Sequence, residues 1–175
     1  KLKTLGFIYG TQTSLSIEPN DLLVAPSKDK QIQLAKNFEE NIKKSKAQGF
    51  LNPLHASQQV IELWAQVSET LKDNIIEFFL QTNPLNSLYV MAFSGARGSM
   101  SQVRQLLAIR GLMSDPQGDI IEMPIRSNFI EGLSVIEYLI SSYGARKGLV
   151  DTALGTANAG YLTRLLVEVG HQQGS

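Results

Sequence analysis

Several kinds of residue are absent or scarce in this 175-residue sequence. There is no cysteine, which excludes disulfides and thiolate metal sites and fits a reducing compartment. The two histidines, His55 and His171, lie far apart in sequence and leave little basis for Ser-His or His-rich metal chemistry. Aromatic residues make up only 7%, which is low for a compact enzyme core. Every apolar run falls well short of the roughly 20 residues that a transmembrane helix needs, so we expect no membrane span.

The sequence also lacks a charge excess of either sign. Sixteen basic and sixteen acidic residues balance, which argues against a free-standing cationic nucleic-acid binder but not against a local basic site. The two halves nevertheless differ, because residues 1–90 carry nine lysines and no arginine, whereas residues 91–175 carry six arginines and one lysine. The guanidinium fork of arginine suits phosphate and carboxylate. We therefore expect anion chemistry in the second half, with a compositional accident as the alternative.

Apolar periodicity predicts a helical hairpin after an irregular N-terminal segment, residues 1–27, in which Leu5 to Tyr9 is a possible strand. The first helix is expected from Ser27, as its N-cap, to Gln48, and the second from about Ala56 to Gln81. Their expected apolar stripes are Ile32, Ala35, Phe38 and Ile42, and then Val60, Leu63, Trp64, Val67, Leu71, Ile75, Phe78 and Phe79. Charged outer faces indicate that the hairpin projects into solvent or contacts a partner; a two-helix layer on the rest of the chain is the alternative.

Small residues dominate the loop Ser94–Ser99, which precedes a helix expected from about Met100 to Ile109. Glycine allows close backbone approach to a ligand, and a helix N-terminus attracts anions. The loop lacks the P-loop spacing, so a tight turn is the alternative. A short strand is expected at Ile120–Ile125.

A helical period runs from Leu133 to Val169 without proline, which as one helix would be about 50 Å long. Four glycines at about 1 kcal/mol each predict, on propensity alone, two or three shorter helices. One face carries a stripe of small residues: Ser141, Ala145, Gly148, Thr152, Thr156, Ala159 and Thr163. The stripe indicates either close helix packing or a platform for a nucleic-acid base pair.

Six ordered segments carry a family resemblance: Asn83–Ala92, Ser94–Ser99, Gln102–Leu106, Arg110–Met113, Ser142–Leu154 and Thr156–Arg164. Together they resemble the β′ subunit of multisubunit DNA-dependent RNA polymerases, and more specifically the start of the split β″ chain of cyanobacteria and plastids. The resemblance is dense from Asn83 to Val169 and looser before it, where Val60–Trp64 matches best.

The resemblance implies a mainly α fold with an irregular segment at 1–27, a rim-type hairpin at 28–82, a funnel and F-loop region with a minor strand at 83–132, a bridge-type helix at 133–169 and an unmatched tail at 170–175. It implies nucleotide contacts for Arg97, Arg104 and Gln105. It implies nucleic-acid contacts for Arg146, Lys147, Thr152, Thr156, Ala157, Gly160, Tyr161 and Arg164. The small stripe would then give the DNA–RNA hybrid close access to the helix, and the glycines would allow bending.

The implied function is that of a wall of a DNA-directed RNA polymerase, lining the nucleotide-entry channel and supporting the template and the hybrid during nucleotidyl transfer. None of the sixteen acids forms an Asp-x-Asp-x-Asp cluster, so we expect no catalytic residue in this chain and Mg²⁺ bound by another subunit. The expected partners are the α, β and β′ subunits, template DNA, the hybrid, nucleoside triphosphates (NTPs) and a secondary-channel factor at the hairpin. The expected location is the plastid stroma or nucleoid, or a cyanobacterial cytoplasm.

Three positions depart from the family pattern. Ile130, Gly155 and Leu165 stand where the family has basic residues, so we expect weaker hybrid contacts than usual. The alternative function is a non-catalytic helical interaction module. That alternative predicts a break at Gly144 or Gly155, whereas the polymerase interpretation predicts one continuous helix. The sequence also indicates that the chain begins within a longer protein.

Overall fold

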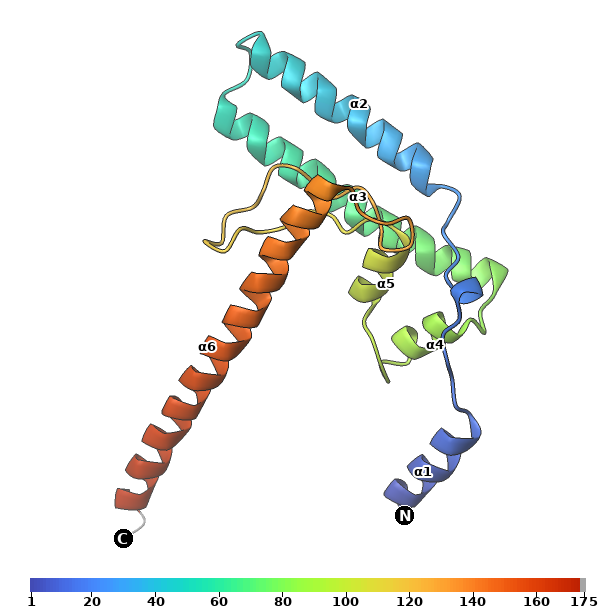
Figure 1. Cartoon of the computed structure of the whole chain (residues 1–175), viewed down its shortest axis with the longest axis vertical. Helices are drawn as coiled ribbons and strands as arrows, with labels where there is room; N and C mark the ends of the chain where they lie inside the picture. The colour runs from blue at the N-terminus through green and yellow to red at the C-terminus, as the bar shows by residue number, and fades with distance from the viewer. Residues whose placement is uncertain (174–175) are drawn as a thin grey trace. The chain divides into compact units, whose positions relative to one another are not determined.

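The computed structural model describes residues 1–173, and the chain is mainly α-helical, as expected (Figure 1). The elements are α1 (Leu2–Gln12), the short 3₁₀ helix η1 (Pro19–Asp21), α2 (Lys28–Ala47), α3 (Pro53–Thr82), α4 (Ser87–Phe93), α5 (Met100–Leu107) and α6 (Val135–Gln173). The chain divides into two compact units. The first contains Lys1–Leu112 and Glu122–Leu133, and the second contains Met113–Ile121 and the chain from Ser134 onward.

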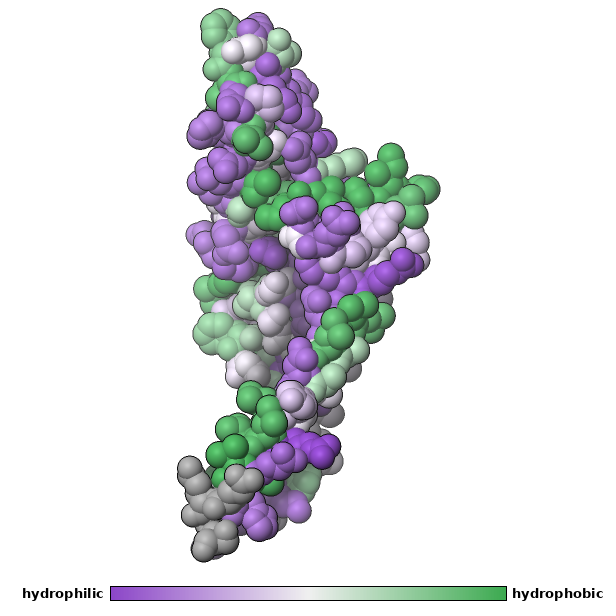
Figure 2. Space-filling model, turned by 90° about the vertical axis from the view of Figure 1, so that its left-hand side faces the viewer, coloured by the Kyte–Doolittle hydropathy of each residue, from purple (hydrophilic) through white to green (hydrophobic). Residues whose placement is uncertain are grey.

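Helices α2 and α3 form the predicted hairpin, with α3 starting three residues earlier than expected (Figure 1). The earlier start has a local cause, because the Asn52 side chain accepts a hydrogen bond from the Leu54 amide at 3.1 Å. Pro53 occupies the first helical position, where a missing N–H costs nothing. Hydrophilic side chains predominate on the face of the hairpin that Figure 2 shows, consistent with the predicted charged outer surface.

The core of the first unit lies along one stripe of α3. Ala56, Val60, Trp64, Ser68, Leu71, Ile75 and Phe79 recur every three or four residues and are all buried. Leu88 and Tyr89 of α4 and Val103 and Leu107 of α5 complete the cluster. The predicted stripe of α2 is wrong at Phe38, which is exposed; the neighbouring carboxylate of Glu39 is buried in its place.

The N-terminal segment differs from its prediction. Leu5 to Tyr9 belongs to α1 and not to a strand. A helix satisfies its own backbone, whereas a strand needs a neighbour to pair with, and none of the described residues forms a sheet. The hydroxyls of Thr11 and Thr13 donate to the carbonyls of Phe7 and Tyr9, each at 2.7 Å. No residue of α1 is buried.

The strand expected at Ile120–Ile125 is also wrong. Two isolated antiparallel bridges stand there instead, Gly111 with Ile125 in the first unit and Ser114 with Ile120 in the second. Pro124 interrupts the segment because it has no N–H to donate to a ladder. The minor strand of the predicted fold is therefore reduced to two bridges among the described residues.

Helix α6 is continuous over 39 residues, as the family resemblance implied and against the breaks that propensity alone predicts. Its start is fixed by a reciprocal cap: the Ser134 hydroxyl accepts from the Glu137 amide at 3.3 Å, and the Glu137 carboxylate accepts from the Ser134 amide at 3.0 Å. Each internal glycine costs only about 1 kcal/mol, less than the unpaired backbone groups of a break. None of the helices in residues 1–173 combines the length and apolar content of a transmembrane span.

Candidate nucleic-acid interface

The loop between α4 and α5 is a tight turn that displays Arg97. Gly95 and Gly98 have φ values of +71° and +78°, in the left-handed region that favours glycine. Ser99 then caps α5: its hydroxyl accepts from the Gln102 amide at 3.3 Å, while the Gln102 side chain accepts from the Ser99 amide at 3.1 Å. The Arg97 side chain is exposed and has no hydrogen bond or ion pair with any described residue.

A cavity of about 190 Å³ lies beside this loop within the first unit. Its walls are mainly apolar side chains of α4 and α5, with Arg97 as the charged residue among them. The lining residues are Ile17, Leu88, Met91, Ala92, Arg97, Gly98, Ser99, Gln102, Val103 and Leu106. The structure thus places the predicted nucleotide-contacting arginine at an open site that could accept an anionic group.

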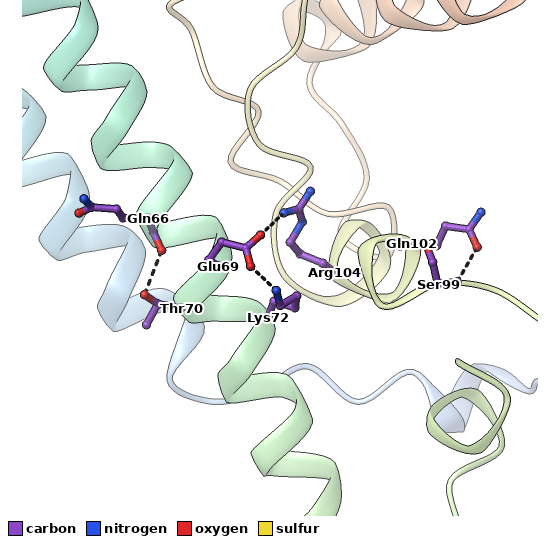
Figure 3. A network of polar contacts seen from close by, with 7 residues as sticks. All are labelled: Gln66, Glu69, Thr70, Lys72, Ser99, Gln102 and Arg104. Carbon is purple, nitrogen blue, oxygen red and sulfur yellow. Dashed lines mark hydrogen bonds and ion pairs between the residues drawn. The ribbon is translucent and has the colours of Figure 1, made fainter. Parts of the chain in front are cut away.

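Arg104 and Gln105 lie on α5, and Arg104 faces α3 (Figure 3). Its Nη1 donates to the carboxylate of Glu69 at 3.3 Å, and Lys72 donates to the same carboxylate. Gln105 is half-buried, and its backbone carbonyl accepts from the Phe129 amide at 3.3 Å. Arg104 therefore has an acceptor within the chain, whereas Arg97 does not.

Arg104 projects from a different side of α5 than Gln102, which lines the cavity together with Arg97. Gln102, on the cavity side, and Arg104 are two residues apart, which is about 200° around a helix. Figure 3 accordingly shows Gln102 beside Ser99, whereas Arg104 points toward Glu69 of α3. The nucleotide contacts predicted for Arg97 and Arg104 remain predictions.

The carboxylate of Glu69 is held in its charged form. The hydrogen bond from Lys72 outweighs desolvation, and the charges of Lys72 and Arg104 add to it, so the pKa of Glu69 lies below its ordinary value. At neutral pH the group is an anion placed between two cations (Figure 3).

A second ionic cluster, which the sequence patterns did not predict, is centred on the buried carboxylate of Glu39. It accepts from Trp64 Nε1 at 3.1 Å, from Lys43 Nζ at 2.6 Å and from Arg126 Nη2 at 3.0 Å. A cavity of about 380 Å³ adjoins the cluster, and Ser57 donates to Glu122 across its rim at 2.5 Å. The signal in the sequence was Trp64, since a buried indole N–H requires an acceptor.

Helix α6 carries the residues for which nucleic-acid contacts are predicted, and every residue from Gly148 to His171 is exposed. The hydroxyls of Thr152, Thr156 and Thr163 donate to the carbonyls four residues earlier, at 2.8, 2.9 and 2.8 Å. Because these hydroxyls are engaged with the backbone, the exposed part of the small stripe, from Gly148 to Thr163, offers chiefly methyl groups and Cα atoms, whereas Ser141 is buried. This part is therefore a narrow, apolar surface along an exposed helix.

The remaining predicted contacts on α6 differ in how free their side chains are. Arg146 is exposed and makes no ion pair with a described residue. Arg164 donates to Glu168 at 3.1 Å, and Lys147 is half-buried with its ammonium beside Gly118. Ala157, Gly160 and Tyr161 are exposed.

A short turn packs against the first part of α6 within the second unit. Ile121 donates to the Met113 carbonyl at 2.9 Å, and Gly118 donates to Asp115 at 2.9 Å. The end of the Met113 side chain occupies the space where Gly144 would carry a Cβ. Gly144 is thus required for close approach, whereas a Cβ at Gly155 would meet nothing within 4 Å.

The three departures from the family pattern all lie at accessible positions. Ile130 and Leu165 are exposed, and Gly155 lies on the exposed part of α6.

Metal-ligand geometry is a separate question. Among residues 1–173, no three His, Asp or Glu side chains lie close enough together to hold an ion. The described residues therefore do not fit a Mg²⁺ site.

Comparison with known proteins identifies the class. The family model of RNA polymerase Rpb1, domain 4, matches residues 51–144, and that of RNA polymerase Rpb1, domain 5, matches residues 132–172. The first match covers more than half of the chain, and the chain therefore belongs to the RNA polymerase Rpb1 family.

Individual relatives narrow the comparison to one subunit. The chain is 54% identical over 172 residues to DNA-directed RNA polymerase subunit beta'' of Cyanophora paradoxa and 55% identical over 170 residues to that of Rhodomonas salina. These alignments cover 98% and 97% of the chain but only 14% and 13% of the two relatives. The resemblance to the β″ chain is thus confirmed over almost the whole sequence, and the chain spans a small part of its relatives' length.

Proposed function

We propose that this chain is part of the β″ subunit of a DNA-directed RNA polymerase, where it lines the nucleotide-entry path and supports the template and the DNA–RNA hybrid. The enzyme transfers a nucleotidyl group from an NTP to the RNA 3′ end. Its Mg²⁺ ions are bound by residues outside this chain. The observation that carries the proposal is α6, a continuous 39-residue helix whose residues are exposed from Gly148 to His171.

The exposed surface of α6 suits a broad, flat partner. In the exposed part of the small stripe, from Gly148 to Thr163, the threonine hydroxyls are engaged with the backbone, which allows close approach without unmet hydrogen bonds, and Arg146 is available to a phosphate. Continuity of the helix through Gly144 and Gly155 favours this function over the helical interaction module, which predicts a break at one of them.

Arg97 is assigned to the NTP triphosphate. It is exposed, lacks an acceptor in the described chain and is displayed by a turn that two glycines define. An arginine in this state binds an anion without first losing an internal ion pair. The α, β and β′ subunits are the proposed protein partners, with a secondary-channel factor at the hairpin of α2 and α3. Relatives from plastid-bearing algae favour the plastid stroma or nucleoid over a cyanobacterial cytoplasm.

The test is NTP use by the assembled polymerase that contains this chain. Arg97→Ala removes a charge-assisted contact, so we expect the KM for NTP to rise about 10- to 100-fold. Lys30→Ala is the matched control, because Lys30 is an exposed cation of α2 with no ion pair in the described chain. An unchanged KM for Arg97→Ala contradicts the assignment.

A further inference from the structure

The contact between α3 and α5 joins three charged side chains whose exposure is unequal. Side-chain exposure is 57% for Glu69 but 20% for Arg104 and 29% for Lys72. The Glu69 side chain is thus the most exposed of the three, and Figure 3 shows its carboxylate between Arg104 and Lys72. Glu69 can turn into water at little cost, whereas the side chains of Arg104 and Lys72 are largely covered.

The Arg104–Glu69 contact has the geometry of a weak restraint. It is a single hydrogen bond of 3.3 Å from Nη1, not the bidentate pairing that a guanidinium makes with a carboxylate at full strength. The Nε atom of Arg104 is buried and has no acceptor among the described residues. Glu69 is engaged more closely by Lys72, its neighbour at i+3 on α3. Because only Nη1 is engaged by a described residue, Nη2 of Arg104 keeps its donors for a second anion.

We propose that Glu69 is a positioning residue that holds Arg104 against α3 until an anionic group, the triphosphate of the incoming nucleotide, replaces the carboxylate. The inference rests on the proposed function, because it takes the assembled polymerase and its NTP as the setting. The exchange is one of hydrogen bonds only: Arg104 Nη1 leaves a Glu69 oxygen and donates to a phosphate oxygen, while Lys72 keeps Glu69.

If the Glu69 carboxylate and the triphosphate compete for Arg104, removing the carboxylate charge should strengthen NTP binding. Glu69→Gln removes the competing charge and keeps the size of the side chain, so the assembled polymerase should bind NTP more tightly. The expected fall in KM at low salt is about twofold to fivefold, the range that exposed ion pairs contribute, with kcat unchanged. The difference should shrink as salt is raised, since exposed charges are screened. Glu69→Asp retains the charge and should restore the original KM.

A matched control separates this competition from a general change of charge. Glu62 is an exposed acid two turns earlier on the same face of α3, with no ion pair in the described chain, and Glu62→Gln should leave KM unchanged. In an Arg104→Gln background, Glu69→Gln should have no effect, because the group for which carboxylate and phosphate compete is gone.

Other outcomes overturn the inference. An unchanged or raised KM for Glu69→Gln means that Glu69 only joins α5 to α3. The same KM fall for Glu62→Gln means that net charge alone acts. If Arg97→Ala raises KM while Arg104→Gln does not, the proposed function is supported, but the proposal that Glu69 positions Arg104 for the triphosphate is wrong. If neither arginine matters, the nucleotide-path part of the proposed function falls as well.

Discussion

The buried carboxylate of Glu39 should be the most sensitive polar position of the first unit. Glu39→Ala leaves the fully buried Trp64 N–H without its acceptor, which costs about 1–3 kcal/mol, and removes a charge-assisted bond to Arg126 of similar size. Lys43 is largely exposed and returns to water at little cost. With partial relaxation, we expect a loss of about 2–4 kcal/mol of unfolding free energy. Glu39→Gln keeps an acceptor for Trp64 and should lose about half as much.

The assay is urea unfolding of the chain followed by fluorescence, since Trp64 is its only tryptophan and contacts the substituted residue. Glu40→Ala is the matched control, because Glu40 is the adjacent, exposed acid with no ion pair in the described chain, and should change stability by less than about 0.5 kcal/mol. A Glu39→Ala variant as stable as Glu40→Ala would refute the reasoning.

The pH dependence of the same variants provides an independent check. Burial alone would raise the pKa of Glu39, but the hydrogen bond from Lys43, the charges of Arg126 and Lys43 and the hydrogen bond from Trp64 together lower it below its ordinary 4.5. The unfolded chain therefore binds the proton first as pH falls. The stabilisation by this charge is present above pH 4.5 and is lost as pH falls through the lower, folded pKa. The stability gap between wild type and Glu39→Gln should narrow on acidification, and a constant gap would contradict a stabilisation by the Glu39 charge.

Two further predictions concern α6. Gly155→Ala should stabilise the helix by about 1 kcal/mol and slow hydrogen exchange nearby about fivefold. Gly144→Ala should stabilise the helix less, because the Met113 side chain must move to make room for the Cβ. Equal stabilisation by the two substitutions would count against the packing of Met113 on Gly144. Leu165→Arg should tighten binding of the assembled polymerase to a DNA–RNA scaffold and steepen its salt dependence by about one phosphate contact. An unchanged salt slope would show that position 165 does not face nucleic acid.

Periodicity predicted the hairpin well because α2 and α3 bury one stripe each and end at strong local signals. The sequence could not show which of Phe38 and Glu39 is buried, since both positions fit a helical period. Glu39 is the buried one because the Trp64 N–H requires an acceptor. Leu5–Tyr9 has a composition typical of a strand, but a strand needs a partner that the described chain does not supply.

The candidate site was predicted residue by residue only through family resemblance. Composition indicated that arginine matters in the second half, yet it could not separate Arg97, which has no internal acceptor, from Arg104, which is paired with Glu69 from another helix. That pairing joins residues 35 positions apart and leaves no periodic signal. Helix propensity likewise could not predict that α6 is continuous, because four glycines within it favour breaks.

If the small stripe of α6 lies against nucleic acid, as we propose, a photo-crosslinking residue at position 156 should report the contact. In the assembled polymerase stalled on a DNA–RNA scaffold, we expect a probe replacing Thr156 to crosslink to the template or the hybrid. A probe replacing Leu154, about 200° away around the helix, should give much less. Equal yields at the two positions, or none at Thr156, would contradict the account.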